Sequence, residues 1–318
     1  MVLLEVSNLK TYFYTLRGIV KAVDGVSLTL DRGQTLGIVG ESGCGKSTLA
    51  WSIMGLVPPP GRIAGGSIKI DGDDITKMRE GDVRSKIRWK KVSMIFQGAM
   101  NALNPVYKVA DQIAEPLLYS GAPRDEAYAR VAELLEMVGL DPKIGERYPH
   151  ELSGGQKQRV VIAMALIMEP DLVIADEPTT ALDVVVQAQI LNLMKELQRK
   201  KRRSIIIISH DLGVVSELAE KIAVMYAGKI VEYGTAEQIF NNPMHPYTQA
   251  LIRAIPRLTG PVTKLEYIPG SPPDLRSPPP GCRFAPRCSK VMDICRSEEP
   301  VLEELEKDHF VACWLYRR

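Results

Sequence analysis

The chain has no long hydrophobic run, little net charge and few cysteines, and each scarcity limits what the protein can be. Apolar runs such as residues 160–168 fall far short of the roughly 18–20 residues that a membrane span needs. The N-terminus has no basic segment followed by a long apolar core, so we expect no signal peptide. A formal net charge of +2 does not by itself indicate nucleic-acid binding. We therefore expect a soluble intracellular chain that reaches a membrane only through a partner.

The few cysteines are unevenly placed. Cys44 stands alone, whereas Cys282, Cys288, Cys295 and Cys313 crowd one end of the chain. In a reducing compartment, such clustered thiols favour a metal or cluster site over disulfides. Their spacing, C-x5-C-x6-C-x17-C, is neither the C-x2-C pair of common zinc sites nor a ferredoxin run. The residues alone leave a [4Fe–4S] cluster and a zinc ion both open.

The most specific motif is the glycine-rich loop 40–47, which matches G-x-x-x-x-G-K-[ST] at every fixed position. The apolar segment 35–39 predicts a buried strand before it, and segment 48–54 predicts a helix after it. Glycines let the backbone N–H groups turn inward toward an anion, which the positive end of the helix also favours. Lys46 is suited to the β- and γ-phosphates and Ser47 to Mg²⁺. The predicted nucleotide-binding residues of this loop are Gly40, Ser42, Gly43, Cys44, Gly45, Lys46, Ser47 and Thr48.

Three further apolar segments predict buried strands, and each of these strands is followed by polar residues. Gln97 ends the first, Asp176 and Glu177 end the second, and His210 ends the third. In an α/β sheet the carboxyl ends of the strands are where ligands bind. Asp176 suits the Mg²⁺ shell, and Glu177 suits a general base that polarises the attacking water. His210 at its strand end could contact a γ-phosphate.

A second helix N-terminus with exposed N–H groups is predicted at residues 152–156, Leu-Ser-Gly-Gly-Gln, ahead of a helix over 157–168. Since the first helix N-terminus already serves the glycine-rich loop, this second one suggests contact with a nucleotide held by another subunit. The helical pattern of residues 107–150 predicts an insert between two halves of the nucleotide domain.

An aromatic cluster, residues 12–14, precedes the glycine-rich loop. Phe13 is the first choice for stacking on a nucleotide base, and Tyr12 is the second. Ordinary packing within a strand is the alternative for each ring.

Taken in order, these motifs resemble the ATP-binding subunit of ATP-binding-cassette (ABC) transporters over residues 2–240, with Leu-Ser-Gly-Gly-Gln as the family signature. The resemblance implies an α/β fold, a P-loop NTPase nucleotide-binding domain of the ABC type. It implies an antiparallel β subdomain and a helical subdomain at about 98–165. We place the ATPase domain at 1–240 and a small, irregular, proline-rich and cysteine-containing extension at 241–318.

The same resemblance implies a head-to-tail dimer that sandwiches two ATP molecules. Gln97 would reach the Mg²⁺ ion and sense the membrane subunit, Glu177 would act as the base, and His210 would stabilise the transferring phosphoryl group. The residues implied for the nucleotide bound by the partner are Ser153, Gly154, Gly155 and, coupling the two sites, Asp183. Thr180 stands where a serine is usual.

The end of the chain resembles the dipeptide/oligopeptide importer ATPases in its His-Pro-Tyr-Thr stretch at 245–248, its proline-rich segment and its four cysteines. Nickel importers share much of this pattern. The resemblance implies two transmembrane permease subunits, an extracytoplasmic solute-binding protein and a place on the cytoplasmic face of the membrane. It also implies a second ATPase subunit, for which it favours a sister chain (a heterodimer) and leaves a homodimer as the alternative. It favours the [4Fe–4S] cluster over zinc.

Two further expectations concern partners. Residues 106–107 and 117–119 of the helical insert are candidates for docking a permease, with packing inside the insert as the alternative. One phosphate loop and one signature argue against soluble ABC ATPases that remodel nucleic acid or ribosomes, because these usually carry two cassettes or a long coiled-coil insertion.

Overall fold

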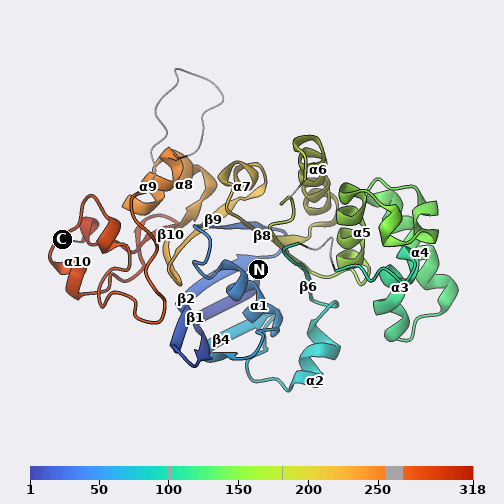
Figure 1. Cartoon of the computed structure of the whole chain (residues 1–318), viewed down its shortest axis with the longest axis horizontal. Coiled ribbons are helices and arrows are strands. Elements are labelled where there is room, and N and C mark those ends of the chain that lie inside the picture. Colours follow the sequence, from blue (N-terminus) through green and yellow to red (C-terminus); the bar gives the residue numbers. More distant parts are fainter. Residues whose placement is uncertain (99–101, 181, 255–267, 318) are drawn as a thin grey trace. The chain divides into compact units, whose positions relative to one another are not determined.

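The computed structural model describes residues 1–98, 102–180, 182–254 and 268–317, and they form two compact units (Figure 1). We call Met1, residues 31–34 and residues 77–207 the helical unit. Residues 2–30, 35–76 and those from 208 onward are the phosphate-loop unit. Ala181 and the first half of the predicted proline-rich segment lie outside the described residues. No helix within the described ranges combines the length and hydropathy that crossing a bilayer requires.

The phosphate-loop unit contains two sheets and several helices. Its strands are β1 (Val2–Thr15), β2 (Gly18–Asp31), β3 (Thr35–Val39), β4 (Gly61–Ile70), β5 (Asp73–Asp74), β9 (Lys221–Tyr226), β10 (Lys229–Thr235), β11 (Glu303–Glu306) and β12 (His309–Val311). Its helices are α1 (Lys46–Met54), α7 (Leu212–Leu218), α8 (Ala236–Asn241), α9 (Pro246–Arg253) and α10 (Ile294–Ser297), with 3-10 turns at Ala285–Arg287 and Trp314–Tyr316.

The two sheets of this unit differ in the direction of their strand pairing. One has the order β2-β1-β4-β5, with β1, β4 and β5 antiparallel, as the alternating pattern predicts. The other runs β11-β12-β10-β9-β3, and here β3 pairs in parallel with β9. Every residue of β3 is buried, which fits a strand covered on both faces. The extension is thus less irregular than predicted, because β11 and β12 add an antiparallel hairpin to the edge at β10.

The helical unit places helices beside a short run of strands. Its strands β6 (Val92–Ile95), β7 (Leu172–Asp176) and β8 (Ser204–Ser209, whose last two residues belong to the other unit) have the order β8-β7-β6. Its helices are α2 (Glu80–Asp82), α3 (Val109–Tyr119), α4 (Arg124–Met137), α5 (Gly154–Leu166) and α6 (Val184–Lys201), with a π-helical turn at Val83–Ile87 and 3-10 turns at Pro142–Glu146 and Pro149–Glu151. Figure 1 shows α3, α4 and α5 gathered together, as the predicted helical insert requires.

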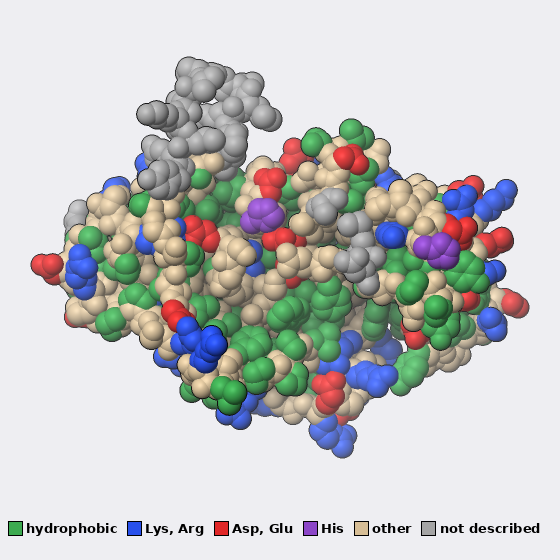
Figure 2. Space-filling model, in the orientation of Figure 1, with side chains coloured by type: hydrophobic (Ala, Val, Ile, Leu, Met, Phe, Trp, Pro, Cys, Tyr) green, Lys and Arg blue, Asp and Glu red, His purple; other side chains and the backbone are tan. Residues whose placement is uncertain are grey.

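Both units enclose apolar cores. In the helical unit, Ile162 of α5, Val173 of β7 and Met194 of α6 line one small internal cavity and are buried. On the face shown in Figure 2, basic and acidic side chains are intermixed, in keeping with the net charge of +2. Burial of apolar area contributes about 25 cal/mol per Å² and is the main stabilising term in such a fold.

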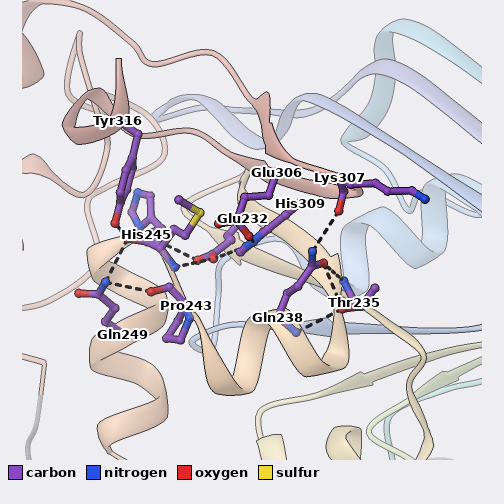
Figure 3. A network of polar contacts seen from close by, with 11 residues as sticks. Glu232, Thr235, Gln238, Pro243, His245, Gln249, Glu306, Lys307, His309 and Tyr316 are labelled. Atoms are coloured by element: carbon purple, nitrogen blue, oxygen red, sulfur yellow. Dashed lines mark hydrogen bonds and ion pairs between the residues drawn. The ribbon is translucent and has the colours of Figure 1, made fainter. Parts of the chain in front are cut away.

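A buried polar network ties the extension to the cassette (Figure 3). Glu232 of β10 is fully buried, and its carboxylate accepts the N–H groups of Met244 at 2.7 Å and His245 at 2.9 Å. His309 of β12 contacts the same carboxylate through Nε2 at 2.8 Å. The hydrogen bond to Glu232 raises the pKa of His309. This single carboxylate therefore joins β10, β12 and the start of α9.

Candidate active site

The phosphate loop lies between β3 and α1, and two of its glycines are required by close backbone approaches. Gly40 has φ 148°, and a Cβ there would lie 2.1 Å from the carbonyl oxygen of Met225. Gly45 has φ 106° and caps α1, and a Cβ there would lie 2.1 Å from the carbonyl oxygen of Ala22. The loop is thus pressed against its neighbours in a conformation that only glycine adopts readily.

Lys46 is enclosed by the loop that it follows. Its side chain is 6% exposed, and Nζ donates to the carbonyl oxygens of Gly40 at 2.7 Å and Glu41 at 3.0 Å. The ammonium group is therefore held inside the ring of loop carbonyls, at the N-terminus of α1. Cys44 is buried nearby, and burial raises the pKa of its thiol. It acts as a small packing group rather than a reactive thiolate.

Glu41 is bonded through every polar group that it has. Its N–H donates to the hydroxyl of Tyr247 at 2.9 Å, and its carbonyl accepts from Lys46. Its carboxylate receives two hydrogen bonds from Arg287, at 2.6 and 2.9 Å. Glu41 and Arg287 were not predicted as site residues, and Tyr247 entered the prediction only as part of the His-Pro-Tyr-Thr stretch at 245–248. The available signals were an acidic residue inside a phosphate loop and an arginine next to Cys288.

In the helical unit the ends of β6 and β7 bring two predicted residues together. The strands are parallel, with Ile95 opposite Ala175. The side-chain amide of Gln97 donates to Oε2 of Glu177 at 2.8 Å, and Thr180 Oγ1 donates to the same oxygen at 3.1 Å. Glu177 has φ 48°, a left-handed conformation that is uncommon for a non-glycine residue. Such strain persists at sites where the surrounding structure holds a side chain in a required direction.

The remaining strand-end residues differ in exposure. Asp176 is the last residue of β7 and is buried. His210 directly follows β8 and is exposed, in the phosphate-loop unit. The next residue, Asp211, caps α7 by accepting the N–H of Gly213 at 2.8 Å.

The second predicted helix N-terminus begins α5. Ser153 is its N-cap and forms a capping box with Gln156. The helix starts at Gly154 rather than Lys157, and both Ser153 and Gly154 are exposed. Gly155 has a packing reason as well, because a Cβ there would lie 2.8 Å from Cγ1 of Val186 on α6.

Asp183, predicted to couple two nucleotide sites, is the N-cap of α6. Its carboxylate accepts the N–H of Val186 at 2.9 Å. The two following valines are unusually exposed for apolar side chains, Val184 by 80% and Val185 by 66%. The start of α6 therefore combines a fixed carboxylate with an apolar surface.

Each candidate for base stacking has a neighbour. The ring of Phe13 on β1 would lie 2.6 Å from a Cβ on Gly61, its partner on β4, so it packs across the strand pair. The hydroxyl of Tyr12 donates to Asp24 at 2.6 Å. Tyr14 lies under the guanidinium of Arg62, at 4.1 Å from the ring centroid. The preference for Phe13 stays a prediction.

The four cysteines at the end of the chain, all of them free thiols, line one small cavity together with His245. Burial raises the pKa of Cys282 and of Cys313 to about 11. Among the described residues, however, no group of three or more histidine, cysteine or acidic side chains is arranged to hold a metal ion. The predicted iron–sulfur cluster is therefore not supported by the arrangement of these side chains.

Two family models match the chain. Residues 23–180 match the ABC transporter family, and residues 231–295 match the oligopeptide/dipeptide transporter C-terminal region. An oligopeptide transport ATP-binding protein of Bacillus subtilis is 51% identical, and the match covers 99% of this chain and 97% of the relative. The chain belongs to the ABC transporter ATP-binding proteins of the oligopeptide/dipeptide type.

Further relatives and structures agree with this assignment. A dipeptide transport ATP-binding protein of Bacillus subtilis is 50% identical over 98% of this ABC ATPase and 94% of its own length. The solved structure described as a dimeric bacterial ABC transporter cassette, MJ0796, matches with a TM-score of 0.67 and 28% identity. That match covers 73% of this chain and 98% of MJ0796, so it extends over the cassette. A post-hydrolysis state of MJ0796 with ADP and phosphate bound matches similarly, with a TM-score of 0.66.

Proposed function

We propose that this ABC ATPase powers the uptake of dipeptides or oligopeptides through a membrane permease. The proposal of ATP hydrolysis rests on the hydrogen bond of Gln97 to Glu177 at 2.8 Å. This bond holds the carboxylate of Glu177, which directly follows β7, in a fixed position. Peptide uptake is supported by the C-terminal family match and by relatives at about 50% identity that are named for oligopeptide or dipeptide transport.

We assign the chemistry to this chain's own oxygen and nitrogen groups. Lys46 and Thr48, with the N–H groups of the loop, bind the phosphates of ATP. The Ser47 hydroxyl, the Asp176 carboxylate and the Gln97 amide oxygen are hard donors that would hold Mg²⁺, which would supply positive charge to the phosphates. Glu177 takes the proton of the attacking water.

His210 and the signature helix complete the proposed site. His210, exposed directly after β8, is proposed to stabilise the transferring phosphoryl group. The hydroxyl of Ser153 and the N–H groups of Gly154 and Gly155 are proposed to bind the γ-phosphate held by a second ATPase subunit, because that helix start is exposed. Exposed Val184, next to Asp183, supports an interface at the start of α6. Subfamily resemblance favours a sister ATPase over a second copy of this chain.

The permease contact is proposed on the helical unit. Val106, Tyr107 and Tyr119 are exposed by 70%, 56% and 76%, whereas Leu117 and Leu118 are half-buried. Exposed large apolar side chains of this kind are the support for the proposed contact. We place the protein on the cytoplasmic face of the membrane, held by two permease subunits that receive solute from an extracytoplasmic binding protein.

We propose that Cys282, Cys288, Cys295 and Cys313 bind a [4Fe–4S] cluster, with zinc as the alternative. Four thiols that form no disulfide line one cavity, although their side chains are not arranged as a metal-binding group. The proposal therefore rests on this shared cavity and on the resemblance to the dipeptide-type importers. Deprotonated thiolates would hold the cluster, and the cluster would then link and stabilise the segments of the extension. Anaerobic purification should give brown protein with about four irons per chain. Colourless protein that contains zinc, or no metal, would refute the cluster.

The domain boundary at residue 240 remains our proposal. The C-terminal family region beginning at 231 supports it, although the compact units divide the chain elsewhere.

The transport assignment is tested by isolating the protein from mildly solubilised membranes and identifying its partners by mass spectrometry. Two multi-span permeases and a second ATPase should co-purify. A receptor that binds nickel rather than peptides would overturn the peptide assignment, and ribosomal partners would overturn transport itself.

A further inference from the structure

We propose that the C-terminal extension positions the phosphate loop for ATP through Glu41, with Arg287 and Tyr247 as the positioning residues. Neither residue belongs to the nucleotide motifs. Both lie more than 200 positions after Glu41 in the sequence, yet both bond to it in the phosphate-loop unit.

The contact with Arg287 is a two-pronged, charge-assisted pair. Its two terminal nitrogens donate to the two carboxylate oxygens of Glu41 at 2.6 and 2.9 Å. The arginine side chain is only 5% exposed, so water screens the pair poorly. Arg287 is itself fixed, because its Nε donates to the carbonyl of Pro269 at 2.8 Å and a terminal nitrogen donates to the hydroxyl of Tyr226 at 3.2 Å. Planar pairing of this kind fixes direction as well as distance.

The contact with Tyr247 holds the backbone of the same residue. The N–H of Glu41 donates to the tyrosine hydroxyl at 2.9 Å. Tyr247 is fully buried, and its ring packs on Tyr226 and Phe284 with centroids 4.6 and 5.3 Å away. A rigid aromatic anchor in the extension thus holds the loop at its second residue.

Fixing Glu41 also fixes the group that meets the phosphates. The carbonyl of Glu41 accepts from Lys46 Nζ at 3.0 Å and from the N–H of Cys44 at 3.3 Å. Residue 41 therefore sets where the lysine lies and how the loop curls, while its own position is set from the extension. Preorganising a binding loop improves affinity because less ordering remains to be done on binding.

A second attachment supports the other side of the loop. Arg283, next to Cys282, is buried and donates to the carbonyl of Ala227 and to Asp24. The neighbouring N–H of Gly228 donates to the carbonyl of Cys44 at 2.8 Å. Each of the first two cysteines of the cavity thus adjoins an arginine that reaches the cassette beside the loop.

The test measures binding of Mg²⁺ with a non-hydrolysable ATP analogue to the full-length chain by calorimetry. We expect Arg287→Met to raise Kd about 5- to 150-fold, the usual range for coupling between two sites. Arg287→Lys should recover part of the affinity, because one charged donor remains. The matched control is Arg276→Met, which removes an arginine of the same extension whose exposed pair is with Asp274. It should leave Kd unchanged.

A purely structural role for the pair makes a different prediction. Arg287→Met would then lower the melting temperature while the folded protein bound the analogue with unchanged Kd, and that result would overturn the proposal. If Arg287→Met fails to fold, Glu41→Gln tests the same pair from the loop. In the ATPase assay, KM should rise more than kcat falls. The double variant Arg287→Met/Glu41→Gln should have a Kd no higher than that of the single variant with the higher Kd. Losses of affinity that add up in the double variant would contradict coupling through Glu41.

Discussion

The two helix N-termini assigned to phosphate binding are built in opposite ways. At α1, Lys46 is buried and the extension bonds the loop residue Glu41 at both its N–H and its carboxylate. At α5, Ser153 and Gly154 are exposed, and the helix is capped by its own capping box. The first site is thus finished within one chain, whereas the second presents N–H groups outward. This difference is what our proposal requires, in which a phosphate held by another subunit completes the second site.

The largest expected effect is a loss of the ATPase rate without a loss of ATP binding. Glu177→Gln should lower the ATPase rate about 10²- to 10⁴-fold, because an amide cannot accept the proton of the attacking water. ATP affinity should remain, since the phosphate loop is untouched. The matched control is Glu115→Gln on α3, an exposed glutamate, which should hydrolyse ATP normally. A Glu177→Gln variant with the wild-type rate would show that the base lies elsewhere.

Gly154→Glu should disrupt phosphate binding at the start of α5 and leave the phosphate loop at α1 unchanged. A carboxylate in the first turn of α5 favours the helix by about 0.3–1 kcal/mol, so stability should not fall. It should nevertheless repel the partner's phosphate, and we expect ATPase activity to drop about 100-fold, as when a reacting oxyanion loses one donor. Binding of ATP to the isolated chain should not change. Gly154→Ala, the uncharged control, should keep most of the activity; equal loss in both variants would refute the electrostatic explanation.

Gly155→Ala should act by packing instead. The added methyl group would lie 2.8 Å from Val186, so we expect a loss of about 1–3 kcal/mol in the free energy of unfolding. Gly81→Ala is the control, because nothing lies within 4 Å of a Cβ there. Urea unfolding measures both variants, and equal midpoints would mean that α5 and α6 shift apart without cost.

An effect on stability of similar size concerns the attachment of the extension, and it shrinks as pH rises. Contact with Glu232, and secondarily with Glu306, raises the pKa of His309 above its unfolded value of about 6.5. The stabilisation is therefore complete below about pH 6.5 and is lost as pH rises through the raised folded pKa. His309→Gln should cost about 1.5–3 kcal/mol at pH 6 and less at pH 9. The exposed His150→Gln is the control, and an equal cost at both pH values would contradict the ion pair.

The sequence predicted the cassette well because its motifs combine local signals. The rule that ligand groups follow strands of an α/β sheet placed Gln97 and Glu177 each at a strand end, and the structure brings their side chains within 2.8 Å. The start of α5 was misplaced by three residues, since two glycines weaken a helix prediction. Gly155 was predicted for phosphate contact alone, and its packing against Val186 depends on a different helix, α6.

The contacts of the extension could not be predicted from the sequence. Arg287 and Glu41 are 246 positions apart, and His309 and Glu232 are 77 apart. No periodicity or local motif connects such residues, because their pairing depends on how β10, α9 and β12 come together in three dimensions. The hairpin β11–β12 was missed for a related reason: the strands have four and three residues, and the sheet edge at β10 stabilises them.

The most direct test of the account is the ATPase rate of the reconstituted transporter in lipid vesicles, with its permeases, sister ATPase and solute receptor, measured with and without peptide. The account predicts that di- or oligopeptides stimulate hydrolysis, and that Glu177→Gln in this subunit removes the stimulation. A rate that ignores peptides and responds to Ni²⁺ would contradict the peptide assignment, and an undiminished rate in Glu177→Gln would contradict the proposed site.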